Sequence, residues 1–105
     1  MSNNIENLNN VIIEGIVKKN PKITNGRMHF PICHTYFDTE GNIDKYLLTI
    51  VLSDKINKEV IPYIQEDKTV RVIGKLIHRN GIYTYILAQD VEIKYQKYDS
   101  KGRVV

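Results

Sequence analysis

Hydrophobic and polar positions alternate with a period of two along most of the chain, and this pattern predicts β-strands. Between residues 27 and 37, for example, Phe30 and Ile32 fall on the opposite face from Cys33, and we expect Phe30 in the core. Five such runs predict strands at residues 11–18, 27–37, 45–53, 68–79 and 82–94. The third run is apolar on both faces, which is expected of a strand that lies deep in the fold.

Residues 54–67 break the alternation and favour a helix. Apolar residues there recur at helical spacing, namely Ile56, Val60, Ile61 and Ile64. Asp54 could cap the start of this helix. Pro62 either lies in the first turn of a short helix or kinks a longer one.

The predicted order is three strands, a short helix and two strands. It matches an all-β fold, a five-stranded Greek-key barrel of the OB type with a short helix between strands 3 and 4. An immunoglobulin-like sandwich is the structural alternative, but it needs about seven strands.

The dipeptide Asn80-Gly81 predicts a tight hairpin between the last two strands, because both residues tolerate the left-handed backbone of a type I′ turn. With a two-residue loop, Arg79 would lie opposite Ile82, and Tyr85 would share the core face with Leu76. The outward face would then carry Ile73, Ile77, Ile82 and Ile86 beside basic residues. Such a face is a candidate contact surface.

The length of 105 residues is enough for one domain. We assign the barrel to residues 10–94. The polar, asparagine-rich residues 1–9 are expected to be disordered, and the basic residues 95–105 are expected to form a flexible tail.

Composition narrows the class of protein. The single cysteine, Cys33, excludes an internal disulfide, and the polar N-terminus does not resemble a signal peptide. No apolar stretch approaches the ~20 residues of a membrane span. We therefore expect a cytoplasmic protein with no membrane partner. The net charge of +3 and the pI near 9.0 permit a polyanionic partner.

Three segments resemble bacterial single-stranded DNA-binding proteins in their order and spacing. The segments are residues 9–23 (NNVIIEGIVKKNPKI), 69–76 (TVRVIGKL) and 86–93 (ILAQDVEI). In length the chain is similar to primosomal replication protein B, a relative of that family. The resemblance implies an OB fold, binding of single-stranded DNA and assembly through paired first strands, here residues 11–18.

The chain also departs from this family. It has no tryptophan, although Tyr46 stands at or within one residue of a family tryptophan and Leu52 near a family phenylalanine. The long aromatic hairpin of the family is shortened to Asn80-Gly81, and its acidic C-terminal tip is replaced by a basic end. The resemblance therefore supports the fold and the ligand class more than the recruitment of partner proteins.

Single-strand binders combine cations for the phosphates with aromatic rings for the bases. The candidate cations are Lys18, Lys19, Lys22, Arg27, Lys45, Lys75 and Arg79. The candidate aromatic residues are Tyr36, Phe37, Tyr46 and Tyr83. For each tyrosine the alternative is a half-buried core role, and for each lysine it is plain solvated charge.

Metal binding and catalysis are not expected. His29, Cys33, His34 and His78 could suggest zinc. However, His29 and Cys33 lie ~13 Å apart along one strand, whereas zinc binds its ligands at about 2 Å. No nucleophile elbow, phosphate loop or pair of catalytic carboxylates is present in the sequence. We therefore expect no cofactor and no enzymatic activity.

The function favoured by the sequence is sequence-independent binding of single-stranded DNA in replication, recombination or repair, with RNA as an open alternative. A homodimer or homotetramer at the nucleoid is expected, with replication proteins as further partners. The alternative is an OB-fold accessory of primosome or phage type that mainly binds a protein. Exposed aromatic residues on strands 2 and 3 would favour DNA, and an apolar patch without basic neighbours would favour a protein.

Overall fold

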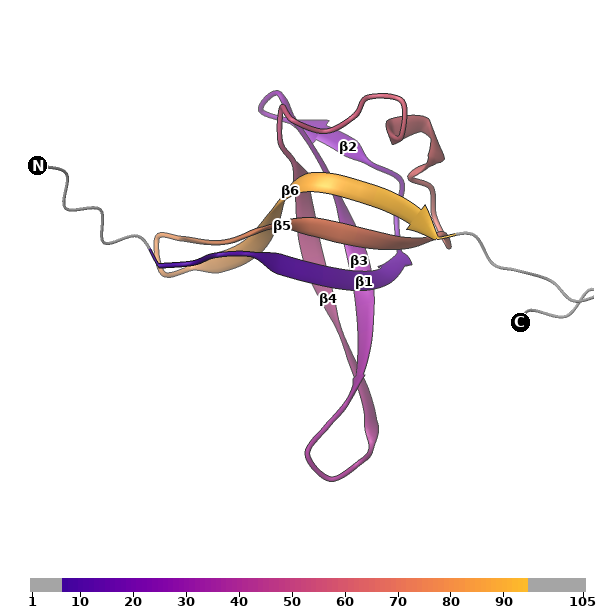
Figure 1. Cartoon of the computed structure of the whole chain (residues 1–105), viewed down its shortest axis with the longest axis vertical. Coiled ribbons are helices and arrows are strands. Elements are labelled where there is room, and N and C mark those ends of the chain that lie inside the picture. Colours follow the sequence, from indigo (N-terminus) through magenta and orange to yellow (C-terminus); the bar gives the residue numbers. More distant parts are fainter. Residues whose placement is uncertain (1–6, 95–105) are drawn as a thin grey trace, which may run out of the picture.

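The computed structural model describes residues 7–94, which form an all-β structure (Figure 1). Its strands are β1 (Val11–Val17), β2 (Lys22–Thr24), β3 (Arg27–Phe37), β4 (Ile43–Leu52), β5 (Thr69–Arg79) and β6 (Tyr83–Lys94). Expectations about residues 1–6 and 95–105 lie outside the described residues.

The strands close into a barrel. Their order across the sheet is β1-β5-β6-β4-β3-β2, and a further pairing of β1 with β3 completes the closure. The pairing of β4 with β6 is parallel, and the other pairings are antiparallel. The predicted barrel of five long strands is confirmed, and β2 adds a short sixth strand that the sequence did not predict.

The core is formed by the apolar positions that alternate toward the barrel interior. The largest fully buried side chains are Val17, Phe30, Ile32, Ile50, Ile64, Val70, Val72 and Ile86. Each contributes about 1.5–3 kcal/mol through the apolar surface that it removes from water. The predicted core position of Phe30 is confirmed, because its side chain is 0% exposed.

The short helix predicted between the third and fourth long strands is present only as a single turn, much shorter than residues 54–67, whose pattern indicated it. Only Ile61–Tyr63 form a helical turn, of the 3-10 type, with Pro62 in its first turn. The missing N–H of proline costs nothing there, since the first N–H groups of a helix have no partner within it. Ile56 and Ile64 are 6% and 2% exposed. The helical spacing of apolar residues here therefore comes from side chains that pack an irregular segment against the core.

Pro31 lies within β3 without disturbing the sheet. On one edge of β3, β2 pairs as far as His29 and β1 pairs from Ile32 onward, so this edge has a gap at Pro31. The Pro31 carbonyl accepts a hydrogen bond from the Lys18 N–H at 2.9 Å across this gap. A residue without an N–H is tolerated at such a position, because no ladder bond requires one.

The hairpin of β5 and β6 has the predicted turn but a different register. Asn80 and Gly81 have φ values of 55° and 65°, and the Ile82 N–H donates to the Arg79 carbonyl at 2.9 Å. The ladder, however, pairs Arg79 with Tyr83 and leaves Ile82 outside it. This one-residue shift exchanges the two faces of β6.

The shift corrects two predictions about side chains. Ile86 pairs with Leu76 and is 1% exposed, so it belongs to the core and not to an outward isoleucine face. Tyr85, predicted to be in the core, pairs with Ile77 on the opposite face and is only half-buried.

A bulge in β6 lies beside Gly74. Ile73 pairs with Asp90 whereas Gly74 pairs with Ala88, so Gln89 has no partner in the ladder. A Cβ atom on Gly74 would lie 2.1 Å from the Leu87 carbonyl oxygen. Glycine is therefore required at this position, because a Cβ atom would clash with the neighbouring backbone.

The β3–β4 hairpin extends beyond the barrel as an arm, which points downward in Figure 1. Its outer part is exposed: Phe37, Ile43 and Leu47 are 73%, 70% and 66% exposed. The prediction that the third strand lies deep in the fold therefore holds only for its end, where Ile50 and Leu52 are buried.

Candidate nucleic-acid interface

One outward face of the barrel is shared by β3, β4, β5 and β6. Side chains of directly paired residues lie on the same face of a sheet. The pairs here are His29 with Val51, Thr49 with Tyr85, and Arg79 with Tyr83. We call the surface formed by His29, Val51, Thr49, Tyr85, Arg79 and Tyr83 the groove face.

A groove of about 570 Å³ opens on the groove face between the turns of two hairpins. One turn is Asn25-Gly26, between β2 and β3, and the other is Asn80-Gly81, between β5 and β6. All four turn residues have positive φ, as type I′ turns require. Arg27 and Arg79, next to these turns, line the groove, and Thr49, Val51 and Leu87 lie between them. We call this site the tyrosine groove.

Two stacked rings, Tyr83 and Tyr85, line the tyrosine groove. Their centroids are 5.9 Å apart and their planes differ by 25°. Tyr83 is 53% exposed and was a predicted site residue. Tyr85 was missed, because its face depends on the register of the hairpin. Together the rings offer the flat, partly exposed surface that unpaired bases stack on.

The cations of the tyrosine groove are not neutralised within residues 7–94. No acidic side chain in this part of the chain forms an ion pair with Arg27 or Arg79. The groove therefore combines aromatic rings with two guanidinium groups that have no acidic partner in the described part of the chain. Guanidinium groups suit phosphate, because their planar fork can donate two parallel hydrogen bonds.

A second hollow of about 220 Å³ adjoins the tyrosine groove. Two predicted site residues line it, Lys19 and Lys22, together with Asn20 and Pro31. His29 and Thr49 line both hollows and therefore mark their junction. We call this second site the lysine hollow.

The structure does not bring the remaining predicted cations to these hollows. Lys18 follows the end of β1 and lines neither of them. Lys75 lines a separate hollow beside residues 7–10. Lys45 pairs with Thr35 on the arm, on the same side of the sheet as the groove face but farther from the groove.

The predicted aromatic residues of the arm fall on opposite sides of it. Phe37 pairs with Ile43 on the side of the groove face, whereas Tyr46 pairs with His34 on the other side. There Tyr36 stacks with His34 at 6.2 Å and lies 5.6 Å from Tyr46 between ring centroids. The structure thus separates Tyr36 and Tyr46 from the tyrosine groove.

The carboxylate of Asp44 makes this second side of the arm acidic. The Tyr36 hydroxyl donates to Asp44 Oδ2 at 3.3 Å. The negative charge of Asp44 raises the pKa of Tyr36 above its usual value, and partial desolvation adds to the increase. A carboxylate at this position opposes the approach of phosphate.

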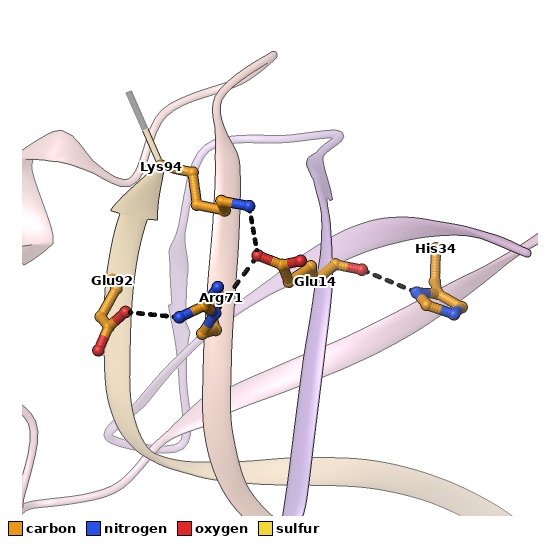
Figure 2. Close-up of polar contacts among 5 residues, drawn as sticks. All are labelled: Glu14, His34, Arg71, Glu92 and Lys94. Carbon is orange, nitrogen blue, oxygen red and sulfur yellow. Dashed lines mark hydrogen bonds and ion pairs between the residues drawn. The ribbon is translucent and has the colours of Figure 1, made fainter. Parts of the chain in front are cut away.

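The outer surface of β1, β5 and β6 carries paired charges, drawn in Figure 2, and we call it the β1 face. Glu14 Oε2 lies 2.8 Å from Lys94 Nζ and 3.3 Å from Arg71 Nε, and Arg71 also reaches Glu92 at 3.6 Å. The hydrogen bond from Lys94 and the positive charges of Lys94 and Arg71 hold the pKa of Glu14 below its usual value.

His34 connects the arm to β1. Its Nδ1 lies 2.7 Å from the backbone oxygen of Glu14 (Figure 2). Because a carbonyl oxygen can only accept a hydrogen bond, the Nδ1 atom of His34 carries the proton. This bond satisfies one backbone group on the edge of β1 that faces away from β5.

Residues 7–94 contain neither a metal site nor a membrane-spanning helix. No three His, Cys, Asp or Glu side chains gather in this range so that they could hold a metal ion. No helix in the same range is long and apolar enough to cross a membrane.

Comparison with known proteins identifies the fold. The chain matches no protein family by sequence, and no curated protein resembles it closely enough to count as a relative. Its structure is similar to a small single-stranded DNA-binding protein from Streptomyces coelicolor, with a TM-score of 0.68 and 17% identity over 85% of this chain and 95% of that one.

Two other solved structures are also similar. One is a Plasmodium falciparum SSB in complex with ssDNA, with a TM-score of 0.62 and 22% identity over 88% of this chain and 99% of that one. The other is the dimeric N-terminal domain of PriB from Thermoanaerobacter tencongensis, with a TM-score of 0.51 and 17% identity over 84% and 98%. The fold is therefore the predicted OB fold.

Proposed function

We propose that this protein binds single-stranded DNA with little sequence preference and that the tyrosine groove is its binding site. The observation that carries this proposal is one groove that holds Arg27 and Arg79, for which residues 7–94 contain no acidic partner, together with the stacked rings of Tyr83 and Tyr85. Cations follow the phosphates and rings accept unpaired bases, without reading which base is present. Such a protein would act in replication, recombination or repair at the nucleoid, as a binder without catalytic activity.

The fold gives independent support. OB barrels bind oligonucleotides on one face of the sheet and through the adjoining loops. The groove face lies on this kind of surface, and two tight hairpin turns border it. Two of the similar solved structures are described as single-stranded DNA-binding proteins, one of them in complex with ssDNA.

Titration of labelled oligo-dT and of a duplex of equal length at two salt concentrations tests the proposal. If Arg27, Arg79, Lys19 and Lys22 each neutralise one phosphate, log K should fall with log salt with a slope of about −2.8. A fourfold increase in salt should then weaken binding about 50-fold. Equal affinity for the duplex, or no binding of the oligonucleotide, would contradict the proposal and favour a protein partner.

We also propose that two copies associate through β1. On the edge away from β5, β1 pairs with β3 only at Ile16 and Val17 among the described residues. Ile12 is 68% exposed, and its backbone groups face the same edge as those of Glu14. An exposed edge strand of this kind pairs readily with a second copy.

Sedimentation of the wild type and of Ile12→Lys tests this assembly. A homodimer or homotetramer is expected for the wild type at micromolar concentration, and the variant should shift toward monomer. A wild type that sediments as a clean monomer would refute it.

A further inference from the structure

Two routes lead out of the tyrosine groove for a strand longer than the groove itself. One follows the arm along β3 toward Phe37. The other crosses the sheet from β6 over β4 and β3 to β2, past Thr49 and His29 to Lys22. Both routes stay on the same side of the sheet, so the choice between them depends on length, charge and side-chain chemistry.

The route across the sheet is the shorter one. Neighbouring strands lie ~4.8 Å apart, so the three steps from β6 to β2 span about 14 Å. From His29 to Phe37 the distance along β3 is about 26 Å at ~3.3 Å per residue. A strand bound in the tyrosine groove therefore meets the lysine hollow before it could reach the outer part of the arm.

The two routes differ more in charge than in length. The route across the sheet leads to Lys22 and Lys19 in the lysine hollow. The arm offers Lys45 and then two acidic residues in its turn, Asp38 and Glu40. Exposed charges act over a screening length of about 8 Å at physiological salt. Phosphates near Phe37 would therefore be repelled, whereas those in the lysine hollow would be attracted.

His29 lies at the junction of the two hollows. Its Nε2 is 2.8 Å from the hydroxyl oxygen of Thr24, which fixes the orientation of the ring. The side chain is partly exposed, and it lies opposite Lys22 on β2 and Val51 on β4. A histidine ring held in this way can stack on a nucleic-acid base.

We propose that a single strand bound in the tyrosine groove crosses the sheet past His29 into the lysine hollow, with the His29 ring stacking on the base at the crossing. The inference rests on the proposed function, because it gives the path of the same ligand. The sequence suggested His29 only as a zinc ligand, whereas this proposal gives it a role in binding DNA.

Oligo-dT of two lengths tests this path, one of about 3 nucleotides that fills only the tyrosine groove and one of about 12. The wild type should bind the longer strand more tightly. Lys19→Gln/Lys22→Gln should remove this gain, with roughly a tenfold or larger loss for the longer strand and little change for the shorter one. Phe37→Ala is the matched control for the arm, and it should preserve the gain.

Variants of His29 test the stacking. His29→Ala should weaken binding of the longer strand by roughly 5- to 150-fold, the range for loss of one stacked base. His29→Phe retains a ring and should bind within about threefold of the wild type by the same argument. Thermal unfolding of each variant checks that the barrel persists.

The outcomes separate this inference from the proposed function. Failure of the wild type to bind either oligonucleotide overturns the function itself. Binding that does not improve with length, that improves only when Phe37 is present, or that is unchanged in His29→Ala overturns the path while the function stands. Equal losses in His29→Ala and His29→Phe overturn the stacking role.

Discussion

Within residues 7–94, Arg27 and Arg79 stand beside aromatic rings on the groove face without an acidic partner, whereas on the β1 face Arg71 and Lys94 share the carboxylate of Glu14. The two faces belong to one barrel and share β5 and β6. Their basic residues nevertheless differ in whether an acidic side chain of residues 7–94 pairs with them. Arg71 and Lys94 have acidic partners on the surface of the protein, whereas residues 7–94 hold no acidic partner for Arg27 or Arg79.

The comparison shows why a count of basic residues does not locate a binding site. Ion pairs at an exposed surface contribute only about 0–1 kcal/mol to stability, but they remove a cation from the set that can meet phosphate. The same reasoning applies to aromatic residues. Tyr46 and Tyr83 have similar exposure, 44% and 53%, but Tyr46 lies near the carboxylate of Asp44 and Tyr83 lies beside Arg79.

The largest expected effect is the loss of stability when Gly74 is substituted, because this residue lies in β5, which both faces share. Gly74→Ala puts a Cβ atom 2.1 Å from the Leu87 carbonyl, so the bulge must shift. We expect a loss of about 3 kcal/mol in the free energy of unfolding. In Gly81→Asn, the control, the left-handed residue has open space around it, and asparagine tolerates that conformation. Denaturant unfolding of both variants measures the difference, and equal stability would contradict the role of the bulge.

The arginines give the most direct contrast between the faces. Arg27→Gln/Arg79→Gln removes two phosphate contacts, so the slope of log K against log salt should flatten by about 1.4. At about 50 mM salt this corresponds to a loss of roughly 50-fold in affinity for oligo-dT. Arg71→Gln on the β1 face should leave both quantities unchanged. Similar losses in the two variants would show that paired and unpaired charges do not differ in the way we infer.

Tyr83 and Tyr46 allow a similar comparison for the stacking of bases on aromatic rings. Tyr83→Ala should cost about 1–3 kcal/mol of binding free energy, because bases lose an aromatic surface in the tyrosine groove. Tyr46→Ala is the matched variant with a similarly exposed ring outside the groove, and its affinity for oligo-dT should match the wild type. Fluorescence anisotropy titrations at one salt concentration measure both. A larger loss in Tyr46→Ala than in Tyr83→Ala would move the site to the other side of the arm.

The smallest effect concerns the β1 face itself. Because the pKa of Glu14 is lowered in the folded state, its ionised form stabilises the fold above the ordinary pKa of 4.5, and this stabilisation disappears as the pH falls through the lowered pKa. Glu14→Gln should therefore be less stable than the wild type near neutral pH, and the difference should vanish in acid. Urea unfolding across this pH range measures it, and a difference that persists in acid would point to a role other than charge.

Several features of the fold could be predicted from local pattern. The period of two located the five long strands, and it placed Phe30 in the core. The Asn80-Gly81 turn also follows from local chemistry, because few residues adopt positive φ at low cost. The helix was predicted too long, because Ile56 and Ile64 are buried at helical spacing although only Ile61–Tyr63 form a helical turn.

The candidate site was only partly visible in the sequence. Arg27, Arg79, Tyr83, Lys19 and Lys22 were named from residue type and position, and they do line the two hollows. Tyr85 was missed because a single unpaired residue at the turn changes the face of every later residue in β6. Phe37 and Tyr46 lie on opposite sides of the arm because of the register of β3 with β4. This register cannot be read from the local sequence pattern.

By itself the sequence determined the five long strands and the Asn80-Gly81 turn, since these depend on each residue and its immediate neighbours. Only the tertiary structure decided that two Asn-Gly turns, separated by more than half of the chain, border one groove, and that His29 and Thr49 join it to a second hollow. It also decided that, among residues 7–94, Arg71 has acidic partners and Arg79 has none. The physical reason is that closure of the barrel brings distant strands into register, and neither register nor the pairing of distant charges is encoded in local periodicity.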